Sequence, residues 1–255
     1  EKKLDDKEPF FTFLPMNAAH WPPFVRDEYR KPAREALNSN PEVLEKLSKA
    51  TLNPYYGDDI NEALVTFLAM GLNIDENIGK LMQFLETKGV LENTIVVFFT
   101  DNGSSFGRHY YNAGMKGGKQ ELFEGGHRVP LFIKGPESII GKPKLIDQLT
   151  HVQDLFPTLA SCIDVTELPQ QIDGVDLLPL MKGEVDKLED RMLVVNFTKT
   201  PGRVNFPDED IPDNWAKPFK ERGVVLWKKW RLLNDKTLYN ISSDPHEDID
   251  IAGQY

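Results

Sequence analysis

The chain has 255 residues, of which 40% are hydrophobic and 10% aromatic, so it can bury a core as one α/β domain or as a core with a small appendage. Its 30 basic and 40 acidic side chains give a formal charge of -10, which would repel a phosphate backbone and argues against nucleic-acid binding. The single cysteine excludes an intrachain disulfide framework, and no apolar run is long enough to predict a membrane span.

The first predicted element is a short β-rich run, Phe10–Leu14, which stops at Pro15. We expect it to form a buried strand that leads into a Pro-rich loop containing His20. The charged residues before this run hold no apolar signal core, so no secretory leader is expected in this chain.

The middle of the chain carries the mixed helix and strand signals of an α/β protein. From Asp59, apolar residues recur every three or four positions, which predicts a helix that ends near Gly89. The next run, 94–100, is apolar without alternation, as expected of a strand buried on both faces of a parallel sheet. A second buried strand over 129–133 and a helix over 152–162 are predicted after it.

The composition of the sequence changes beyond Leu168, where proline and charged residues become frequent. Short runs with alternating or amphipathic character predict strands over 193–197, 223–227 and 230–233. We therefore expect a partial α/β core over residues 1–180 and a small antiparallel subdomain over residues 181–255.

Asp101 and Asn102 stand at the end of the strand predicted over 94–100. Ligands of open α/β sheets bind beyond the carboxyl ends of the strands, and carboxylate and amide oxygens suit calcium or magnesium. The alternative is a plain Asp-Asn-Gly turn, because all three residue types favour turns. Spacing alone leaves both interpretations open.

A glycine-rich stretch over 112–130 contains Lys116, Lys119, His127 and Arg128. Such a loop can bring backbone and cations close to an anion, although its spacing is not that of a P-loop. The alternative is a solvated basic loop. His20 could donate a proton to a leaving group, but a lone loop histidine is more often a surface residue.

Taken together, these stretches resemble the type I sulfatase (arylsulfatase-like) family of the alkaline phosphatase superfamily, in the correct order across most of the chain. Each block is weak alone, and the ordered series is specific. The blocks are Leu14–His20, Asp75–Gly79, Asn93–Gly103, Lys116–Lys119 with Glu124–Pro130, Asp154–Leu159, Asp173–Leu180, and Leu238–Ile241 with Asp244–Glu247.

The resemblance implies a role for four residues. Asp101 and Asn102 would be two ligands of a single divalent cation, with calcium the first choice. Lys119 would contact the sulfate and the leaving-group oxygen, with Lys116 a weaker candidate, and His20 would hydrogen-bond or protonate the leaving group. The implied fold is an alkaline-phosphatase-like, largely parallel sheet flanked by helices, without its N-terminal part.

One family element is absent from the sequence: no Cys-x-[Pro/Ser]-x-Arg occurs, so the formylglycine nucleophile of the family is not encoded in this chain. The paired aspartates of the family's N-terminal strand are also missing. The resemblance therefore covers the C-terminal portion of a sulfate monoester hydrolase, and the chain alone is expected to be inactive. An uncovered sheet edge and apolar face would favour self-association.

Two other classes of function remain open. A phosphatase or phosphonate hydrolase of the same superfamily would share this layout, although Asn102 supplies an oxygen suited to calcium where two-metal relatives tend to place histidine. The other class is a non-catalytic sulfatase-like fragment.

The resemblance further implies a sulfated small molecule or sulfated glycan as substrate, and a periplasmic or secreted location.

Overall fold

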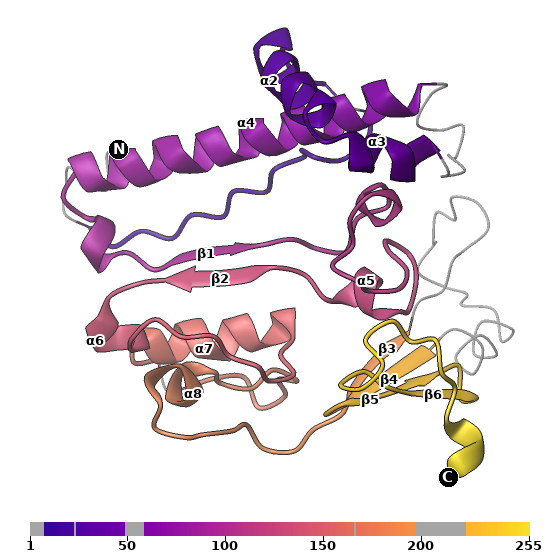
Figure 1. Cartoon of the computed structure of the whole chain (residues 1–255). Coiled ribbons are helices and arrows are strands. Elements are labelled where there is room, and N and C mark those ends of the chain that lie inside the picture. Colours follow the sequence, from indigo (N-terminus) through magenta and orange to yellow (C-terminus); the bar gives the residue numbers. More distant parts are fainter. Residues whose placement is uncertain (1–7, 23, 49–58, 166, 197–222) are drawn as a thin grey trace, which may run out of the picture. The chain divides into compact units, whose positions relative to one another are not determined.

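The computed structural model describes residues 8–22, 24–48, 59–165, 167–196 and 223–255 (Figure 1). The chain divides into two compact units, Glu1–Thr94 and Ile95–Tyr255. The domain boundary expected near residue 180 stays a prediction. Within the described ranges, no helix is both long and apolar enough to cross a membrane.

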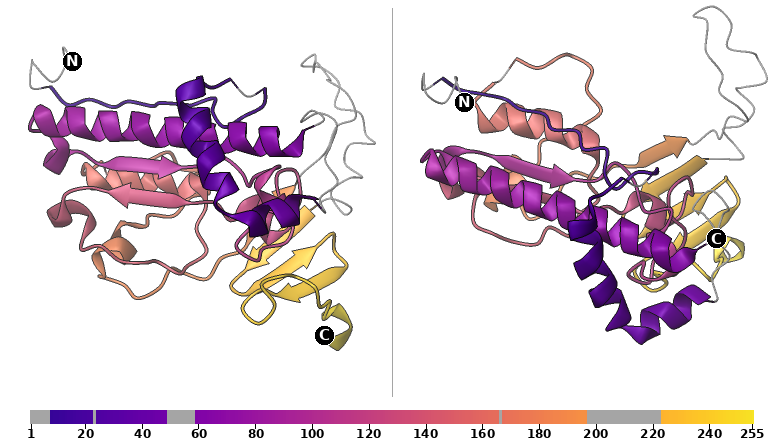
Figure 2. Two further views of the ribbon diagram at one scale, coloured as in Figure 1. Left: turned by 45° about the horizontal axis from the view of Figure 1, so that its top comes forward. Right: turned by 90° about the horizontal axis from the view of Figure 1, so that it is seen from above.

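The first unit is helical and is dominated by α4 (Ile60–Thr87), with α2 (Asp27–Asn38) lying across it and α3 (Pro41–Ser48) following α2 (Figure 2). The helix predicted from Asp59 is confirmed. The Asp59 carboxylate accepts hydrogen bonds of 2.9 and 3.2 Å from backbone N–H groups of the first turn, and Gly89 takes the left-handed conformation (φ 69°) just past the end. A short 3-10 turn, Leu91–Asn93, closes the unit.

The strand predicted over Phe10–Leu14 is wrong for the part of the chain that is described. These residues are extended but pair with no described strand, and Phe11 and Phe13 are 84% and 70% exposed. High β-propensity reflects how well a side chain fits a pleated, half-buried surface, so it cannot make a strand without a partner strand. The prediction of self-association through such apolar surface stays a prediction.

The second unit begins with β1 (Val96–Phe99) and β2 (Leu131–Lys134), which confirm the two predicted core strands. The α/β class is confirmed, but the largely parallel direction expected for the sheet does not hold for this pair: β1 and β2 are antiparallel, with Val97 opposite Ile133. A parallel pair needs a crossover, usually a helix, that returns the chain to its starting end. Residues 100–130 instead hold a 3-10 turn, a glycine-rich loop and one four-residue helix, Glu124–His127, and return the chain in the opposite direction.

Short helices surround a small core in the second unit. The helix predicted over 152–162 is confirmed as a 3-10 turn, Val152–Asp154, that continues into α7 (Leu155–Cys162). Ile140, Leu177, Leu178 and Met181 form one buried cluster, against which Ile95 and Ile133 pack. The helical elements of this unit are 3-10 turns at Gly107–His109 and Ala252–Gln254, α5 (Glu124–His127), α6 (Glu137–Ile140), α7 (Leu155–Cys162) and α8 (Leu178–Lys182).

The C-terminal part of the second unit is an antiparallel sheet in the order β3-β4-β5-β6. Three of its strands were predicted from sequence, and β6 was not. Buried and partly exposed side chains alternate along β4 and β5, as expected of a sheet with one packed face. The strands are β3 (Leu193–Asn196), β4 (Gly223–Trp227), β5 (Trp230–Leu233) and β6 (Thr237–Asn240).

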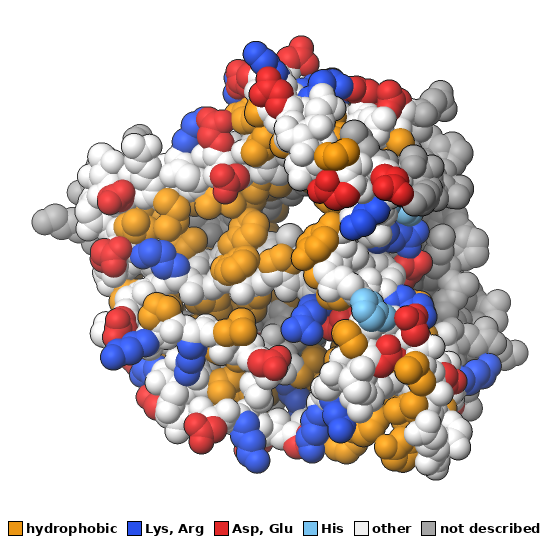
Figure 3. All heavy atoms as spheres, in the orientation of Figure 1, with side chains coloured by type: hydrophobic (Ala, Val, Ile, Leu, Met, Phe, Trp, Pro, Cys, Tyr) orange, Lys and Arg blue, Asp and Glu red, His pale blue; other side chains and the backbone are white. Residues whose placement is uncertain are grey.

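Charged side chains of both signs are intermixed on the face displayed in Figure 3, in keeping with the acidic balance of the whole sequence.

Candidate active site

The turn that carries Asp101 and Asn102 follows β1 after Thr100 and packs on the glycines of α5. The backbone N–H of Gly103 donates a 3.1 Å hydrogen bond to the Gly126 carbonyl oxygen. A Cβ atom at Gly103 would lie 1.8 Å from the Gly125 carbonyl oxygen, so only glycine fits this close approach. The backbone contact fixes the turn while Asp101 stays exposed and Asn102 half-buried.

The segment that carries Lys119 lies against the same turn. The Lys119 backbone N–H lies 3.4 Å from the Ser104 carbonyl oxygen, and a Cβ atom at the buried Gly118 would lie 2.5 Å from that oxygen. Two backbone contacts thus join residues 103–104 to the glycine-rich loop. They bring the segments of Asp101, Asn102 and Lys119 together within the second unit.

His20 belongs to the first unit, where it lies in an exposed turn after the extended segment. Its backbone N–H donates to the Asn17 carbonyl oxygen at 2.8 Å, and its Nδ1 lies 2.6 Å from the carbonyl oxygen of Trp21. The role expected of His20 at the leaving group stays a prediction.

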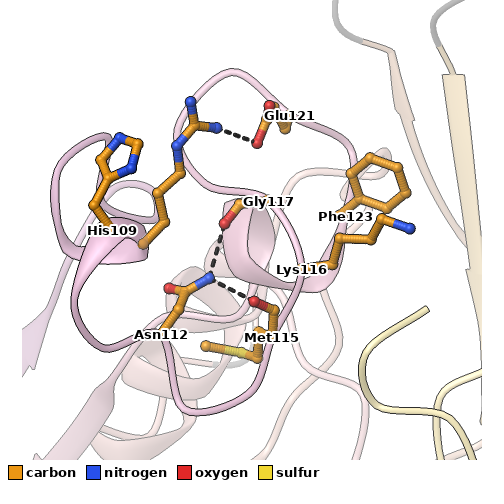
Figure 4. Close-up of a pocket in the computed structure, with 8 residues that line it drawn as sticks. His109, Asn112, Met115, Lys116, Gly117, Glu121 and Phe123 are labelled. Atoms are coloured by element: carbon orange, nitrogen blue, oxygen red, sulfur yellow. Dashed lines mark hydrogen bonds and ion pairs between the residues drawn. The ribbon is translucent and has the colours of Figure 1, made fainter. Parts of the chain in front are cut away.

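An open cleft of about 330 Å³ lies within the loop over residues 108–123 (Figure 4). The Asn112 side-chain amide shapes one wall by donating hydrogen bonds of 2.7 and 2.8 Å to the carbonyl oxygens of Met115 and Gly117. Arg108 and Glu121 form a 2.6 Å ion pair at another wall. The lining is mixed, because Met115 and Phe123 face the cleft beside the charged and polar side chains, so it can contact both polar and apolar parts of a ligand.

The Lys116 ammonium group is engaged by the C-terminal segment. It donates a 2.8 Å hydrogen bond to the Glu247 carbonyl oxygen and lies 4.9 Å from the ring centroid of Phe123. Among the described residues, the Lys119 ammonium has no ion pair. Of the two lysines, Lys119 is therefore the one whose charge is available to a ligand.

A buried ion network, which we did not predict from the sequence, links the loop to the antiparallel sheet. Arg231 on β5 reaches Glu124 at 2.7 Å and Glu247 at 2.8 Å, and it donates to the Leu122 carbonyl oxygen at 2.9 Å. Arg231 is 1% and Glu247 0% exposed. One signal was available: Arg231 shares the buried face of β5 with Leu233, a position where an arginine requires partners.

Comparison with known proteins decides the family. The Sulfatase family model matches residues 2–165 of the chain, which is more than half of its length. The chain belongs to the Sulfatase family. This membership confirms the resemblance drawn from the ordered blocks of sequence.

Curated sulfatases match most of this chain but extend well beyond it. An N-acetylglucosamine-6-O-sulfatase of Bacteroides thetaiotaomicron is 32% identical over 208 residues, covering 81% of this chain and 34% of the relative. An arylsulfatase K of Xenopus laevis is 27% identical over 217 residues, covering 79% of this chain and 36% of the relative. The sulfatase chain thus spans about a third of the length of these two relatives.

Solved structures share the fold. A crystal structure of Ps i-CgsB in complex with k-i-k-neocarrahexaose superposes with a TM-score of 0.72 at 22% identity, covering 99% of this chain and 48% of that one. A phosphonate monoester hydrolase from Silicibacter pomeroyi superposes with a TM-score of 0.55 at 19% identity, covering 87% of this chain and 45% of that one. Both therefore have the alkaline-phosphatase-like fold expected for this sulfatase chain.

The donor set at the β1 end fits a hard cation in part. Asp101 supplies a carboxylate and Asn102 an amide oxygen, ligands that calcium and magnesium accept, while calcium takes about six or more oxygens in all. In the described part of this sulfatase chain, no group of three or more His, Cys, Asp or Glu side chains could hold a metal ion. The two residues would therefore be a partial ligand set.

A second buried ion pair supports the turn that precedes α7. Arg191 donates hydrogen bonds of 2.7 and 2.6 Å to the two carboxylate oxygens of Asp154, which also accept from the backbone N–H groups of His151 and Val175. Burial alone would raise the pKa of Asp154, but the hydrogen bonds from Arg191 and the backbone outweigh it and hold the pKa below its usual range.

His127 gives the second unit a testable pH dependence. Burial, and then the positive charge of Arg231, lower the pKa of His127 to about 4, whereas an unfolded histidine titrates near about 6.5. The unfolded chain therefore binds more protons between these values, so the stability that this group contributes is present above pH 6.5 and lost as the pH falls toward 4. We expect His127→Asn to weaken the fall in the free energy of unfolding between pH 7 and pH 4.5, as measured by urea unfolding. An unchanged pH dependence would contradict the lowered pKa of His127.

Proposed function

We propose that this chain supplies part of the active site of a sulfate-ester hydrolase, with Asp101 and Asn102 as ligands of a divalent cation and Lys119 as the sulfate-binding cation. The proposal rests on two backbone contacts, Gly103 to Gly126 and Lys119 to Ser104. They join the end of β1 to the glycine-rich stretch over 112–130, which we call the lysine loop. Family membership supplies the reaction class.

The residues of the chain have distinct tasks in this proposal. When bound, the divalent cation would supply positive charge for the sulfuryl oxygens. The Lys119 ammonium donates hydrogen bonds to the sulfate and to the leaving-group oxygen, where negative charge develops. His20 donates a proton or a hydrogen bond to the departing alkoxide or phenoxide. The formylglycine nucleophile comes from outside these residues, because Cys162 is followed by Ile163-Asp164-Val165.

A sulfated saccharide is the substrate class that we favour. The cleft at residues 108–123 places Arg108, Asn112 and Glu121 where they can hydrogen-bond hydroxyl groups. Several relatives are named for saccharide substrates: an N-acetylglucosamine-6-O-sulfatase, an N-acetylgalactosamine-6-sulfatase and an ulvan-active sulfatase. The second candidate, a phosphonate or phosphate ester hydrolase, rests on the shared fold of the phosphonate monoester hydrolase. Asn102 argues against it, because its amide oxygen suits calcium better than a transition metal.

Replacing Lys119 by Ala is expected to lower kcat for an aryl sulfate by about 100-fold or more, because it removes the positive charge that is proposed to stabilise the developing anion. The assay requires a polypeptide in which this chain follows a segment carrying Cys-x-[Pro/Ser]-x-Arg, matured to formylglycine. Lys142→Ala, at an exposed lysine outside the loop, is the matched control and should retain kcat. Equal turnover of the Lys119 variant and the parent would remove the proposed role. Parallel assays with sulfate, phosphate and phosphonate esters rank the two candidate functions.

The 255-residue chain by itself is expected to hydrolyse no aryl sulfate and to bind calcium with a Kd of about 1 mM or weaker. Two side-chain ligands leave most of the coordination sphere to water, and a calcium site normally has about six or more oxygen ligands. Isothermal titration calorimetry with calcium chloride measures the affinity. A tightly bound, stoichiometric metal found by elemental analysis would contradict the first expectation, and turnover by the purified chain would contradict the second.

A further inference from the structure

The glycine-rich loop is held from outside by the segment that follows β6. The Glu247 carboxylate accepts a 2.7 Å hydrogen bond from the backbone N–H of Glu124, and the Glu247 carbonyl oxygen accepts one of 2.8 Å from Lys116. The ring of His246 packs so closely on Gly114 that a Cβ atom there would lie 2.9 Å from it. Three points of the loop thus depend on two consecutive residues near the C-terminus.

Arg231 lies at the centre of these contacts. Its guanidinium group joins Glu124 at the start of α5 to Glu247 in the C-terminal segment. It also donates to the Leu122 carbonyl oxygen and lies 3.0 Å from Nδ1 of His127. Burying two carboxylates with one guanidinium group is costly unless the geometry is good, so such an arrangement is weak evidence of a gain in stability. What the arrangement does provide is a fixed direction and distance between β5 and the loop.

The contacts continue from Glu124 to the candidate site. Next to Glu124, the backbone N–H of Gly125 donates a 2.8 Å hydrogen bond to the Lys116 carbonyl oxygen. The Gly126 carbonyl oxygen accepts from Gly103, which follows Asp101 and Asn102. A shift of Glu124 would therefore move both the lysine loop and the turn that carries the proposed metal ligands.

We propose that Arg231, together with Glu247, is a positioning residue of the lysine loop: through Glu124 it sets where Lys119 and the Asp101–Asn102 turn lie relative to each other. This role in catalysis rests on the proposed sulfate-ester hydrolase function, whereas the positioning of the loop itself can be tested without it. Arg231 and Glu247 touch no substrate in this scheme.

The first test measures amide hydrogen exchange in the purified 255-residue chain by NMR. Arg231→Met is expected to speed exchange at Gly103 and Gly125 by about tenfold or more relative to Phe98 in β1, because loop contacts open without unfolding of the whole unit. Glu247→Gln, which keeps an acceptor for the Glu124 N–H but loses the charge, should give a smaller increase. The Glu247→Gln variant tests the positioning of the loop even if Arg231→Met does not fold.

Arg191→Met is the matched control, since it breaks the other buried ion pair of the same unit and touches none of residues 112–126. It should lower the melting temperature but leave the exchange ratio between Gly125 and Phe98 as in the parent. Arg231→Lys, which keeps the charge but not the planar fork, should restore part of the protection. An unchanged ratio in both Arg231→Met and Glu247→Gln would overturn the positioning of the loop.

The second test uses the formylglycine-bearing polypeptide with an aryl sulfate. Arg231→Met should lower kcat by about tenfold or more with KM within about threefold, the pattern of an interaction lost mainly in the transition state. A loosened loop with unchanged kcat would overturn the catalytic part of the proposal. If the parent polypeptide hydrolyses no sulfate ester, the proposed function fails, and the exchange ratios still decide whether Arg231 positions the loop.

Discussion

Arg191→Met is expected to lower the free energy of unfolding of the second unit by about 3–5 kcal/mol, because it leaves the carboxylate of Asp154 buried without its charged partner. Asp154 is 0% exposed and takes two hydrogen bonds from Arg191. Urea unfolding followed by circular dichroism measures the difference. The double variant Asp154→Leu with Arg191→Met should recover much of the loss, because it removes both charges together.

The pH dependence provides an independent check on the same pair. Because the pKa of Asp154 is held below its unfolded value, the stability it contributes is present above about pH 4, near the unfolded pKa, and is lost as the pH falls through the folded pKa. This acid-induced loss should be smaller in Arg191→Met than in the parent. A single variant that loses less than about 1 kcal/mol at pH 7 would show that water reaches Asp154, contrary to its buried position.

Gly103→Ala is expected to lower the free energy of unfolding by about 3 kcal/mol or more, at the upper end of what overpacking costs. The new methyl group would lie 1.8 Å from the Gly125 carbonyl oxygen, a backbone atom that cannot move aside as a side chain would. Thermal unfolding measures the loss. In the formylglycine-bearing polypeptide, kcat for an aryl sulfate should also fall, because the turn carries Asp101 and Asn102.

Gly79→Ala is the matched control for this substitution. Gly79 lies inside α4, where a Cβ atom would meet nothing within 4 Å. Alanine is the better helix former, so this change should raise stability by about 0.5–1 kcal/mol. If Gly103→Ala and Gly79→Ala had equally small effects on stability, the close packing of Gly103 against α5 would be contradicted.

The elements best predicted from sequence are those with a local signal. Helix α4 has a regular apolar period, an Asp59 cap and a terminal Gly89, and strand β1 is a short apolar run before a turn. Phe10–Leu14 has a similar local signal and still forms no strand among the described residues, since pairing depends on a partner that propensity does not encode. The direction of the β1–β2 pair likewise depends on how residues 100–130 fold.

The candidate site residues Asp101, Asn102 and Lys119 come from sequence motifs, and their roles stay predictions. The structure brings the segments that carry them together through Gly103 and Ser104. Arg231 and Glu247 could not be assigned in the same way, because their partners lie about a hundred residues earlier in the chain. Identifying them requires knowing that the antiparallel sheet lies beside the loop.

The separation of these partners along the chain has a consequence for biosynthesis. Lys116 and Glu247 are 131 residues apart. At a translation rate of about 5–20 residues per second, the lysine loop exists for roughly 7–26 s before its anchor is made. During that interval its glycines and basic residues have no native contacts to the C-terminal segment, so the nascent loop is open to proteases and chaperones. Any event that stops synthesis before residue 247 would yield a chain whose first strands can form but whose lysine loop stays unanchored.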